Sequence, residues 1–257
     1  MVTYYSFEIQ QEMRRELSST LSALDNLIFH VANDQFNNEG SNKFAKHGVG
    51  RRIRLVYHSL RNIFAVIPTN SSELIPDENL INASINLQSF LSNLYGILDN
   101  IAWVWYYENP ELHTIFERHK QQIGLTRKHS QFRKHLPKPF LNTLKQNDNW
   151  ISFIKEIRDA LAHQIPLYII PAMVDEKNKD IYYELDNQKL SCIISRDFDT
   201  FDKIEKQQRS MSYFHPYWIK ETKGETTPMV LHPQAISDAK TIIVILKEFL
   251  KTFQGRS

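Results

Sequence analysis

The sequence predicts a mainly α-helical protein, a helical bundle that carries a small β-hairpin or sheet before its C-terminal helix. Only 7 glycines occur in 257 residues, which favours long helices over a succession of short strands joined by tight turns. Apolar residues recur at helical spacing through most of the chain. After Pro166 this spacing gives way to short runs of β-branched and aromatic residues, the pattern typical of strands.

Five segments carry the helical pattern. We expect helices over about residues 7–36, 50–66, 77–108, 148–165 and 232–253. Pro68 and Pro110 each follow the end of a helix, and Asp148 with Asn149 is the expected N-cap of the fourth. The segment 77–108 is the longest and is apolar around most of its circumference. Such a helix is expected at the centre of the bundle or in an oligomer interface.

The predicted β element follows the fourth helix. The runs LYIIPAM, DIYYEL and KLSCIIS are separated by the turn-like segments DEKNKD and DNQ, which predicts a β insertion at about residues 166–198. Cys192 is expected on one of its strands. The segment 199–231 is expected to be irregular or partly helical. We expect one domain, residues 1–257, to contain the bundle and the insertion.

Composition and charge exclude several classes of protein. Hydrophobic residues make up 42% of the chain and charged residues 23%, as in ordinary globular proteins. The net charge of +2 is too small to attract a polyanion over the whole surface, so any such attraction must be local. The single cysteine excludes an internal disulfide and a cysteine-based zinc site. Without a secretory signal or an apolar run of about 18 residues, the protein is expected to be cytoplasmic and to make no membrane contact.

The chemistry is expected near the end of the helix 148–165, where the chain reads IRDALAHQIP. Arg158 and His163 are five residues apart, which places them about 140° from each other around an ideal helix. Both can therefore serve one site only if another surface closes over them. The same helix of a second copy would do so, and the spacing therefore predicts a homodimer through the helices that carry the motif.

The pattern from Arg158 through Asp159 to His163 resembles the R-x4-6-H motif of the HEPN superfamily. The segments FLSNLYGILDNIAW, HQIPLYII and PMVLHPQ add to the resemblance, which covers about residues 50–245. Many members of that superfamily are metal-independent ribonucleases, toxins or antiviral defence effectors. The resemblance implies an antiparallel HEPN-like bundle, cleavage of RNA without a cofactor, and an antitoxin or other partner protein. Some of these toxins continue the motif as His-x-Tyr, whereas this chain has Ile165.

Cleavage of RNA without a metal requires a base for the 2′-hydroxyl, an acid for the leaving oxygen and a cation for the phosphorane. His163 is the candidate base or acid because an imidazole titrates near neutral pH. Arg158 offers a permanent charge and a planar fork of donors for phosphate, and Asp159 is expected to orient one of these groups in a second copy. Alternatively, both side chains are structural, and the bundle binds RNA, nucleotide or a partner protein without catalysis.

A polar stripe runs along the otherwise apolar helix 77–108. Its members recur at steps of three and four: Ser89, Asn93, Gly96, Asp99, Asn100 and Trp103. Gly96 costs about 1 kcal/mol of helix stability relative to alanine, which predicts a close helix crossing there. Asp99 is costly to bury without a cation, and Arg158 is its expected partner, with Arg61 as the alternative. Asn93 and Asp99 are thus predicted to support the site.

The segment 118–138 is strongly basic. It contains seven lysines or arginines, three histidines and no acidic residue, and the triplet RKH occurs in it twice. Such a local field attracts a polyanion, so we expect RNA to contact Arg127, Lys128, Arg133 and Lys134. A solvated loop is the alternative. The chain shows no metal-ligand spacing among its histidines and no nucleotide-binding or hydrolase motif.

Overall fold

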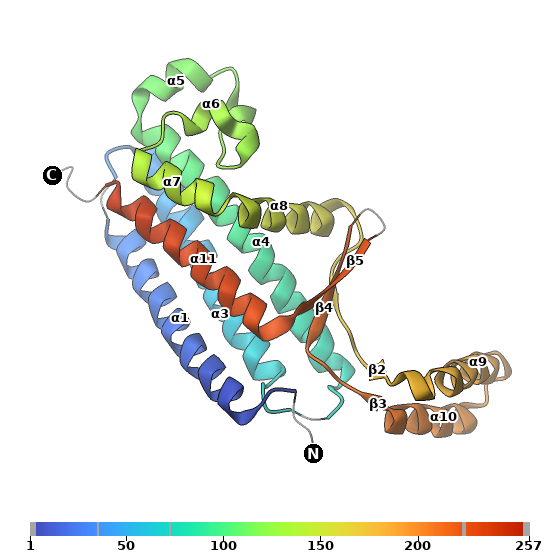
Figure 1. Cartoon of the computed structure of the whole chain (residues 1–257). Helices are drawn as coiled ribbons and strands as arrows, with labels where there is room; N and C mark the ends of the chain where they lie inside the picture. Colours follow the sequence, from blue (N-terminus) through green and yellow to red (C-terminus); the bar gives the residue numbers. More distant parts are fainter. Residues whose placement is uncertain (1–3, 35, 72, 223–224, 254–257) are drawn as a thin grey trace.

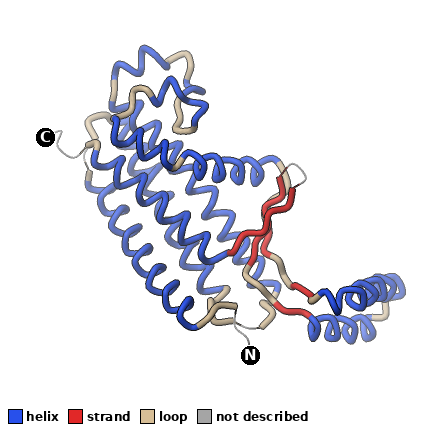
Figure 2. The backbone as a smooth tube through the Cα atoms, viewed as in Figure 1, coloured by secondary structure: helices blue, strands red, loops and turns tan. Residues whose placement is uncertain are grey.

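The structure is a computed structural model that describes residues 4–34, 36–71, 73–222 and 225–253. It is mainly helical with a small antiparallel sheet, as Figures 1 and 2 show, and this confirms the predicted class. The five long helices of the bundle are α1 (Phe7–Asn33), α3 (Arg51–Val66), α4 (Asp77–Glu108), α8 (Asp148–His163) and α11 (Leu231–Lys251). Their ends agree with the predicted helices to within three residues.

Shorter helices connect the long ones. They are α2 (Glu39–Asn42), a π-helix η1 (Lys43–Gly50), α5 (Pro110–Phe116), α6 (Ser130–Arg133), α7 (Lys138–Gln146), and the 3-10 turns η2 (Lys120–Gln122), η3 (Arg127–His129) and η4 (Glu176–Asn178). The π-helix continues directly into α3. Helices α5 and α6 lie together at one end of the bundle, beyond α7 (Figure 1). No helix within the described ranges is both long and apolar enough to cross a membrane.

Helix α4 occupies the centre of the bundle, as its composition predicts. Its buried side chains cover more than half of its circumference: Phe90, Leu94, Ile97, Ile101 and Val104 lie on one side, and Leu91, Leu98 and Ala102 lie about 100° from them. Helices α3 and α8 and the π-helix pack against α4. Full burial of one large apolar side chain contributes about 1.5–3 kcal/mol, so α4 supplies much of the driving force for folding and fixes the positions of its neighbours.

The sheet combines one strand from residues 168–169 with two strands from residues 217–230, and two helices lie between these segments in the sequence. Its order is β1 (Tyr168–Ile169), β4 (Tyr217–Thr222) and β5 (Glu225–Val230), all antiparallel. A separate pair joins β2 (Met173–Val174) to β3 (Ser212–Tyr213). Strand β5 lies at the edge and contains Pro228, which a central strand rarely tolerates because proline has no N–H to donate.

The predicted β insertion at 166–198 is wrong over most of its length. Only β1 and β2 fall within it, and DIYYEL and KLSCIIS belong to α9 (Lys179–Ser195). β-branched and aromatic residues favour a strand only where their alternating side chains meet other strands. Here Leu185 and Cys192, seven residues apart, share one helical face and pack against Ile204 of α10 (Phe198–Met211). Cys192 therefore lies on a helix.

We call α9 and α10 the helical arm. It projects from the bundle beyond the β2–β3 pair (Figure 1). Its buried residues form a small cluster of their own, separate from the main core. The segment 199–231, expected to be irregular or partly helical, thus contains α10 followed by the ordered strands β3, β4 and β5.

Candidate functional site at the contact of α4 and α8

A cleft of about 410 Å³ lies where α3, α4 and α8 meet. Its walls are formed by Arg52, Ser92, Tyr95, Gly96, Asp99, Arg158, Leu161 and Ala162. The four residues of α4 recur at steps of one, three and four, which places them on one face of the helix. The cleft therefore brings together Asp99 and Arg158, the pair that the sequence predicts, and adds Arg52 in place of the alternative partner Arg61.

Arg158 is held by two neighbours, Tyr95 and Asp159. Its guanidinium carbon lies 4.6 Å from the centre of the Tyr95 ring, a cation–π contact. Its Nη1 atom is 3.2 Å from Oδ1 of Asp159, and Asp159 also binds Lys155. The Arg158 side chain remains 37% exposed, so its guanidinium is positioned by its neighbours while one side stays open to a ligand.

Asp99 is an unusual carboxylate because it is exposed to the cleft and yet poorly solvated. The cleft walls displace bulk water and raise the pKa of its carboxyl, and the charges of Arg158 and Arg52 oppose this rise. Tyr95 is buried, and this burial, helped by Asp99, raises the pKa of its phenol to about 12. Tyr95 therefore keeps its proton at neutral pH and remains a hydrogen-bond donor beside Asp99 and Arg158.

Arg52 and Tyr95 also line the cleft, although the sequence predicts neither of them as a site residue. Nη1 of Arg52 donates to Oδ1 of Asn93 at 2.9 Å, and Asn93 donates to the carbonyl of Ser89 at 2.7 Å. Gly96 leaves room for this arginine, since a Cβ there would lie 2.4 Å from Cζ of Arg52. The close approach predicted at Gly96 is therefore made by a guanidinium, not by a helix backbone. Tyr95 lies one turn before Asp99, the only signal for it in the sequence.

Gly96→Ala is expected to displace Arg52 with little effect on stability. The added methyl group breaks the bond to Asn93, and the higher helix propensity of alanine, about 1 kcal/mol, offsets part of that loss. We expect a stability change within about 1 kcal/mol and about tenfold weaker binding of RNA, the ligand that the sequence predicts for this site. Thermal unfolding and RNA titration measure the two effects. Gly50→Ala is the control, since its nearest neighbouring atoms lie 3.6 Å away; equal RNA binding by both variants would exclude Arg52 from the site.

His163 is the last residue of α8 and lies outside the walls of the cleft. Its imidazole is exposed, and within the described residues it forms no hydrogen bond or ion pair. Leu161 and Ala162 line the cleft immediately before it. Arg158 therefore lines the cleft and His163 does not, in agreement with their separation of about 140° around an ideal helix.

The basic segment 118–138 divides into exposed and buried charges. Lys128 and Lys134 are exposed, and the Arg127 side chain is 62% exposed while it bonds Asp148 at 3.2 Å. Arg133 is buried with 7% of its side chain exposed, and its Nη1 lies 2.7 Å from Oδ1 of Asp148. Arg133 therefore forms a buried ion pair, and we no longer expect it to contact RNA. Asp148 begins α8 and binds these arginines rather than acting as its N-cap.

Arg133→Ala is expected to cost about 3 kcal/mol of stability, because it leaves the buried Asp148 carboxylate with only a partly exposed partner. Arg127→Ala is the matched control, expected to cost less than about 1 kcal/mol since its guanidinium faces solvent. Urea unfolding measures both values. Adding Asp148→Asn to Arg133→Ala should recover part of the loss, and an unchanged loss would show that the charge is not its cause.

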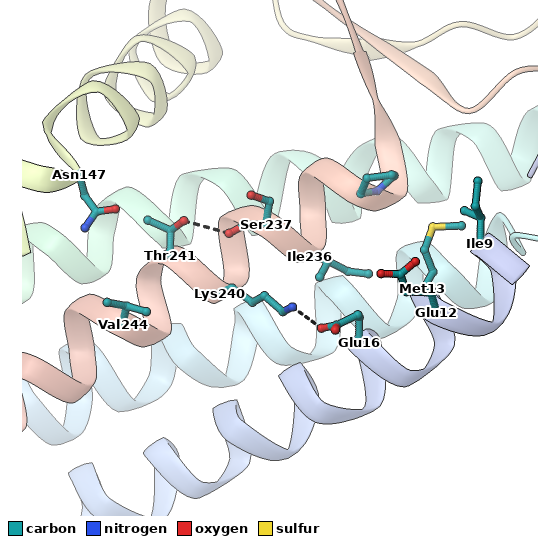
Figure 3. Close-up of a pocket in the computed structure, with 11 residues that line it drawn as sticks. Ile9, Glu12, Met13, Glu16, Asn147, Ile236, Ser237, Lys240, Thr241 and Val244 are labelled. Carbon is teal, nitrogen blue, oxygen red and sulfur yellow. Dashed lines mark hydrogen bonds and ion pairs between the residues drawn. The ribbon is translucent and has the colours of Figure 1, made fainter.

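A second hollow, of about 540 Å³, lies between α1 and α11 (Figure 3). Its walls are mainly apolar, with Met13 and Ile236 among them, and Glu16 forms an ion pair with Lys240 across it. None of the described residues that line it is a histidine, arginine or tyrosine. Among the residues that the structure describes, no group of three or more histidine, cysteine or acidic side chains is disposed to bind a metal ion. The α4–α8 cleft is therefore the stronger candidate site.

Comparisons with protein-family models, with curated proteins and with solved structures find no match to this chain. The chemistry of the cleft and the motif of α8 are therefore the features from which a function can be inferred.

Proposed function

We propose that the chain is a metal-independent endoribonuclease of the HEPN type that acts on single-stranded RNA, as a toxin or antiviral effector. The observation that supports this proposal most strongly is the convergence of Arg52 and Arg158 at an open cleft. The exposed imidazole of His163, which has no partner among the described residues, follows the cleft residues Leu161 and Ala162 in the chain. Two guanidiniums suit the charge and geometry of a phosphodiester. Lys128 and Lys134 add sequence-independent attraction for the RNA backbone.

The proposed reaction uses these groups in a transesterification. The 2′-oxygen attacks the adjacent phosphorus while its proton passes to a base, and the bond from phosphorus to the 5′-oxygen breaks. The leaving oxygen takes a proton from an acid, which gives a 2′,3′-cyclic phosphate and a 5′-hydroxyl. His163 serves as base or acid, and Arg158 with Arg52 stabilises the phosphorane. Asp99 keeps the two guanidiniums in place, and Asp159 orients Arg158.

A second candidate function is binding of RNA or a nucleotide without cleavage. Arg158 is already engaged by Asp159 and Tyr95, and His163 lies outside the cleft, an arrangement that favours binding over catalysis within one copy. In that case the same cleft binds phosphate, and the imidazole contributes only charge.

RNA cleavage by the purified chain in EDTA separates the two functions. We expect Arg158→Ala and His163→Ala each to reduce the cleavage rate at least about 100-fold. The matched controls are Arg61→Ala, an exposed arginine on α3, and His30→Ala, an exposed histidine in the last turn of α1. Cleavage that persists in both site variants would refute the assignment. RNA binding without cleavage by the wild-type protein would establish the second function.

Mixing the two inactive variants tests the predicted homodimer through α8. If one copy supplies Arg158 and the other supplies His163, a heterodimer of the variants contains one intact site. An equimolar mixture then recovers about a quarter of the wild-type activity. A mixture that stays inactive would place both residues of each site in the same copy.

A further inference from the structure

The π-helix η1 and the start of α3 carry an excess of positive charge. Residues 43–54 contain five lysines or arginines and one histidine, and no acidic residue occurs between Glu39 and Glu73. Five of these six side chains are exposed: Lys43, Lys46, His47, Arg51 and Arg54. The sixth, Arg52, forms part of the wall of the cleft. The excess of charge therefore lies beside the candidate site.

These cations are not neutralised by carboxylates of the protein. Among the described residues, none of the ion pairs includes a lysine or arginine of residues 43–54. In segment 118–138, by contrast, two arginines bind Asp148. Like charges three or four residues apart destabilise a helix, so Arg51 and Arg54 do not serve to stabilise α3. Their charge is available to a negatively charged ligand.

The exposed cations and the cleft lie on the same surface of the molecule. Helices α3 and α4 pack side by side, and Asn62 of α3 donates to Asn86 of α4 at 3.2 Å. Arg51 and Arg54 lie about 140–160° around α3 from its fully buried residues. Asp99, a wall of the cleft, likewise lies opposite the buried residues of α4. Because the two helices share one core, the sides that point away from it form one continuous surface.

Aromatic rings extend this surface past the cleft. Trp103 lies one turn after Asp99 on the same side of α4. It is half-buried and stacks on Phe44 of the π-helix with the ring centres 5.5 Å apart, and Phe44 stacks on Tyr107 at 5.6 Å. The exposed Lys43 directly precedes Phe44. Partly exposed rings beside cations are typical of surfaces that bind single strands, because bases stack on the rings while cations bind the phosphates.

We propose that a single-stranded nucleic acid binds along the outer side of η1 and α3. Its phosphates contact Arg51 and Arg54, its bases stack at Phe44 and Trp103, and Arg52 leads the strand into the cleft. The excess of unpaired cations selects a polyanion, and the rings favour a nucleic acid over an acidic protein. That the strand is RNA rests on the proposed function, whereas the surface itself does not depend on cleavage.

Titration of a fluorescently labelled single-stranded RNA with methylated 2′-oxygens tests the proposal, because such a strand cannot undergo transesterification. We expect Arg51→Gln/Arg54→Gln to weaken binding at least about tenfold at about 0.1 M salt. The slope of log Kd against the logarithm of the salt concentration should fall by about 1.4, which is about 0.7 for each lost phosphate contact. The matched control is Lys203→Gln/Lys206→Gln, an exposed pair with the same spacing on α10. It should leave the affinity and the slope unchanged, and circular dichroism should show the same helix content in both variants.

Four results would overturn the inference. The wild-type protein does not bind the methylated strand, or the α3 variant binds it as tightly as the wild-type protein does. A duplex of the same sequence binds as tightly as the single strand, or polyglutamate displaces the strand at equal charge concentration, which would assign the surface to an acidic protein.

The methylated strand also separates this inference from the ribonuclease activity. If the protein cleaves unmodified RNA but the α3 variant binds the methylated strand normally, only the inference fails. If the strand binds through these arginines and unmodified RNA is never cleaved, only the proposed function fails.

Discussion

Asp238→Asn is expected to gain about 4 kcal/mol of stability relative to the wild-type protein as the pH is raised from 4 to 8. Asp238 has no exposed surface. Its Oδ1 accepts hydrogen bonds from Trp150 at 2.9 Å and Gln234 at 2.8 Å, while Oδ2 is buried and has no partner among the described residues. Burial raises the pKa of this carboxyl to about 7, against the two hydrogen bonds.

The sign of the effect follows from where the proton is held. The native carboxyl keeps its proton up to about pH 7, whereas the unfolded chain releases it near its ordinary value of 3.8. The stability that Asp238 contributes is therefore present below pH 3.8 and is lost as the pH rises to 7. Asparagine does not titrate, and its amide occupies the same space. Urea unfolding at several pH values measures the difference, with the exposed Asp25→Asn as control; a difference that does not change with pH would contradict the prediction.

His232→Gln is expected to be less stable than the wild-type protein at pH 7, and this difference should shrink by about 3 kcal/mol as the pH falls from 7 to 4. The trend is opposite to that of Asp238→Asn. His232 is fully buried. Its Nε2 lies 2.7 Å from the carbonyl of Ile67, its Nδ1 lies 3.2 Å from the hydroxyl of Tyr5, and its ring packs on Phe64. The carbonyl accepts from Nε2, and Nδ1 accepts from the tyrosine, so the neutral ring is satisfied.

Burial lowers the pKa of His232 to about 4, although the Ile67 carbonyl opposes the shift. The stability that this residue contributes is therefore present above pH 6.5 and is lost as the pH falls toward 4. Glutamine keeps a donor for the carbonyl but binds no proton in this range. Thermal and urea unfolding across this range measure the deficit. A deficit that stays constant would show that the native ring is protonated as readily as the unfolded one.

The two buried groups act against each other over nearly the same pH range. As the pH rises from 4 to 6.5, the contribution of Asp238 to the free energy of unfolding falls and that of His232 grows. The two changes should therefore largely cancel in the wild-type protein. Each single variant then shows the slope of the group that remains, and the double variant restores a nearly level curve. The cancellation itself is a sharp test, because neither group can be assessed from the wild-type curve alone.

The long helices could be predicted from the sequence because their burial imposes a periodic pattern. Helix α4 is the clearest case, since Phe90, Leu94, Ile97 and Ile101 recur at steps of three and four and none of them is exposed. The same reasoning fails for α9. The exposed Leu190 and Ile194 lie opposite the buried Leu185 and Cys192, so the segment lacks the single apolar stripe that identifies a helix. The remaining signal, a high content of β-branched and aromatic residues, is typical of strands. Strand β5 is hard to predict because it contains Pro228, and a strand tolerates proline mainly where it lies at the edge of a sheet.

The site could be predicted in part. The residue types predict that an arginine lies near Asp99; in the structure Asp99 and Arg158 line the same cleft, while the ion pair of Arg158 is with Asp159. Arg52 could not be found in this way, because its place over Gly96 depends on how α3 lies against α4. Arg133 shows the converse limit: a run of basic residues does not reveal which of them has a buried carboxylate, here Asp148, as its partner.

The β2–β3 pair has a consequence for how this protein can vary. Met173 and Tyr213 are directly paired, so the chain leaves the bundle and returns to it at neighbouring points. The segment between them contains the helical arm and is connected to the bundle through β2 and β3, which have two residues each. Such a segment can be lengthened, shortened or replaced in related chains without moving a residue of α4 or α8. The sequence of the arm can therefore change while the cleft stays constant.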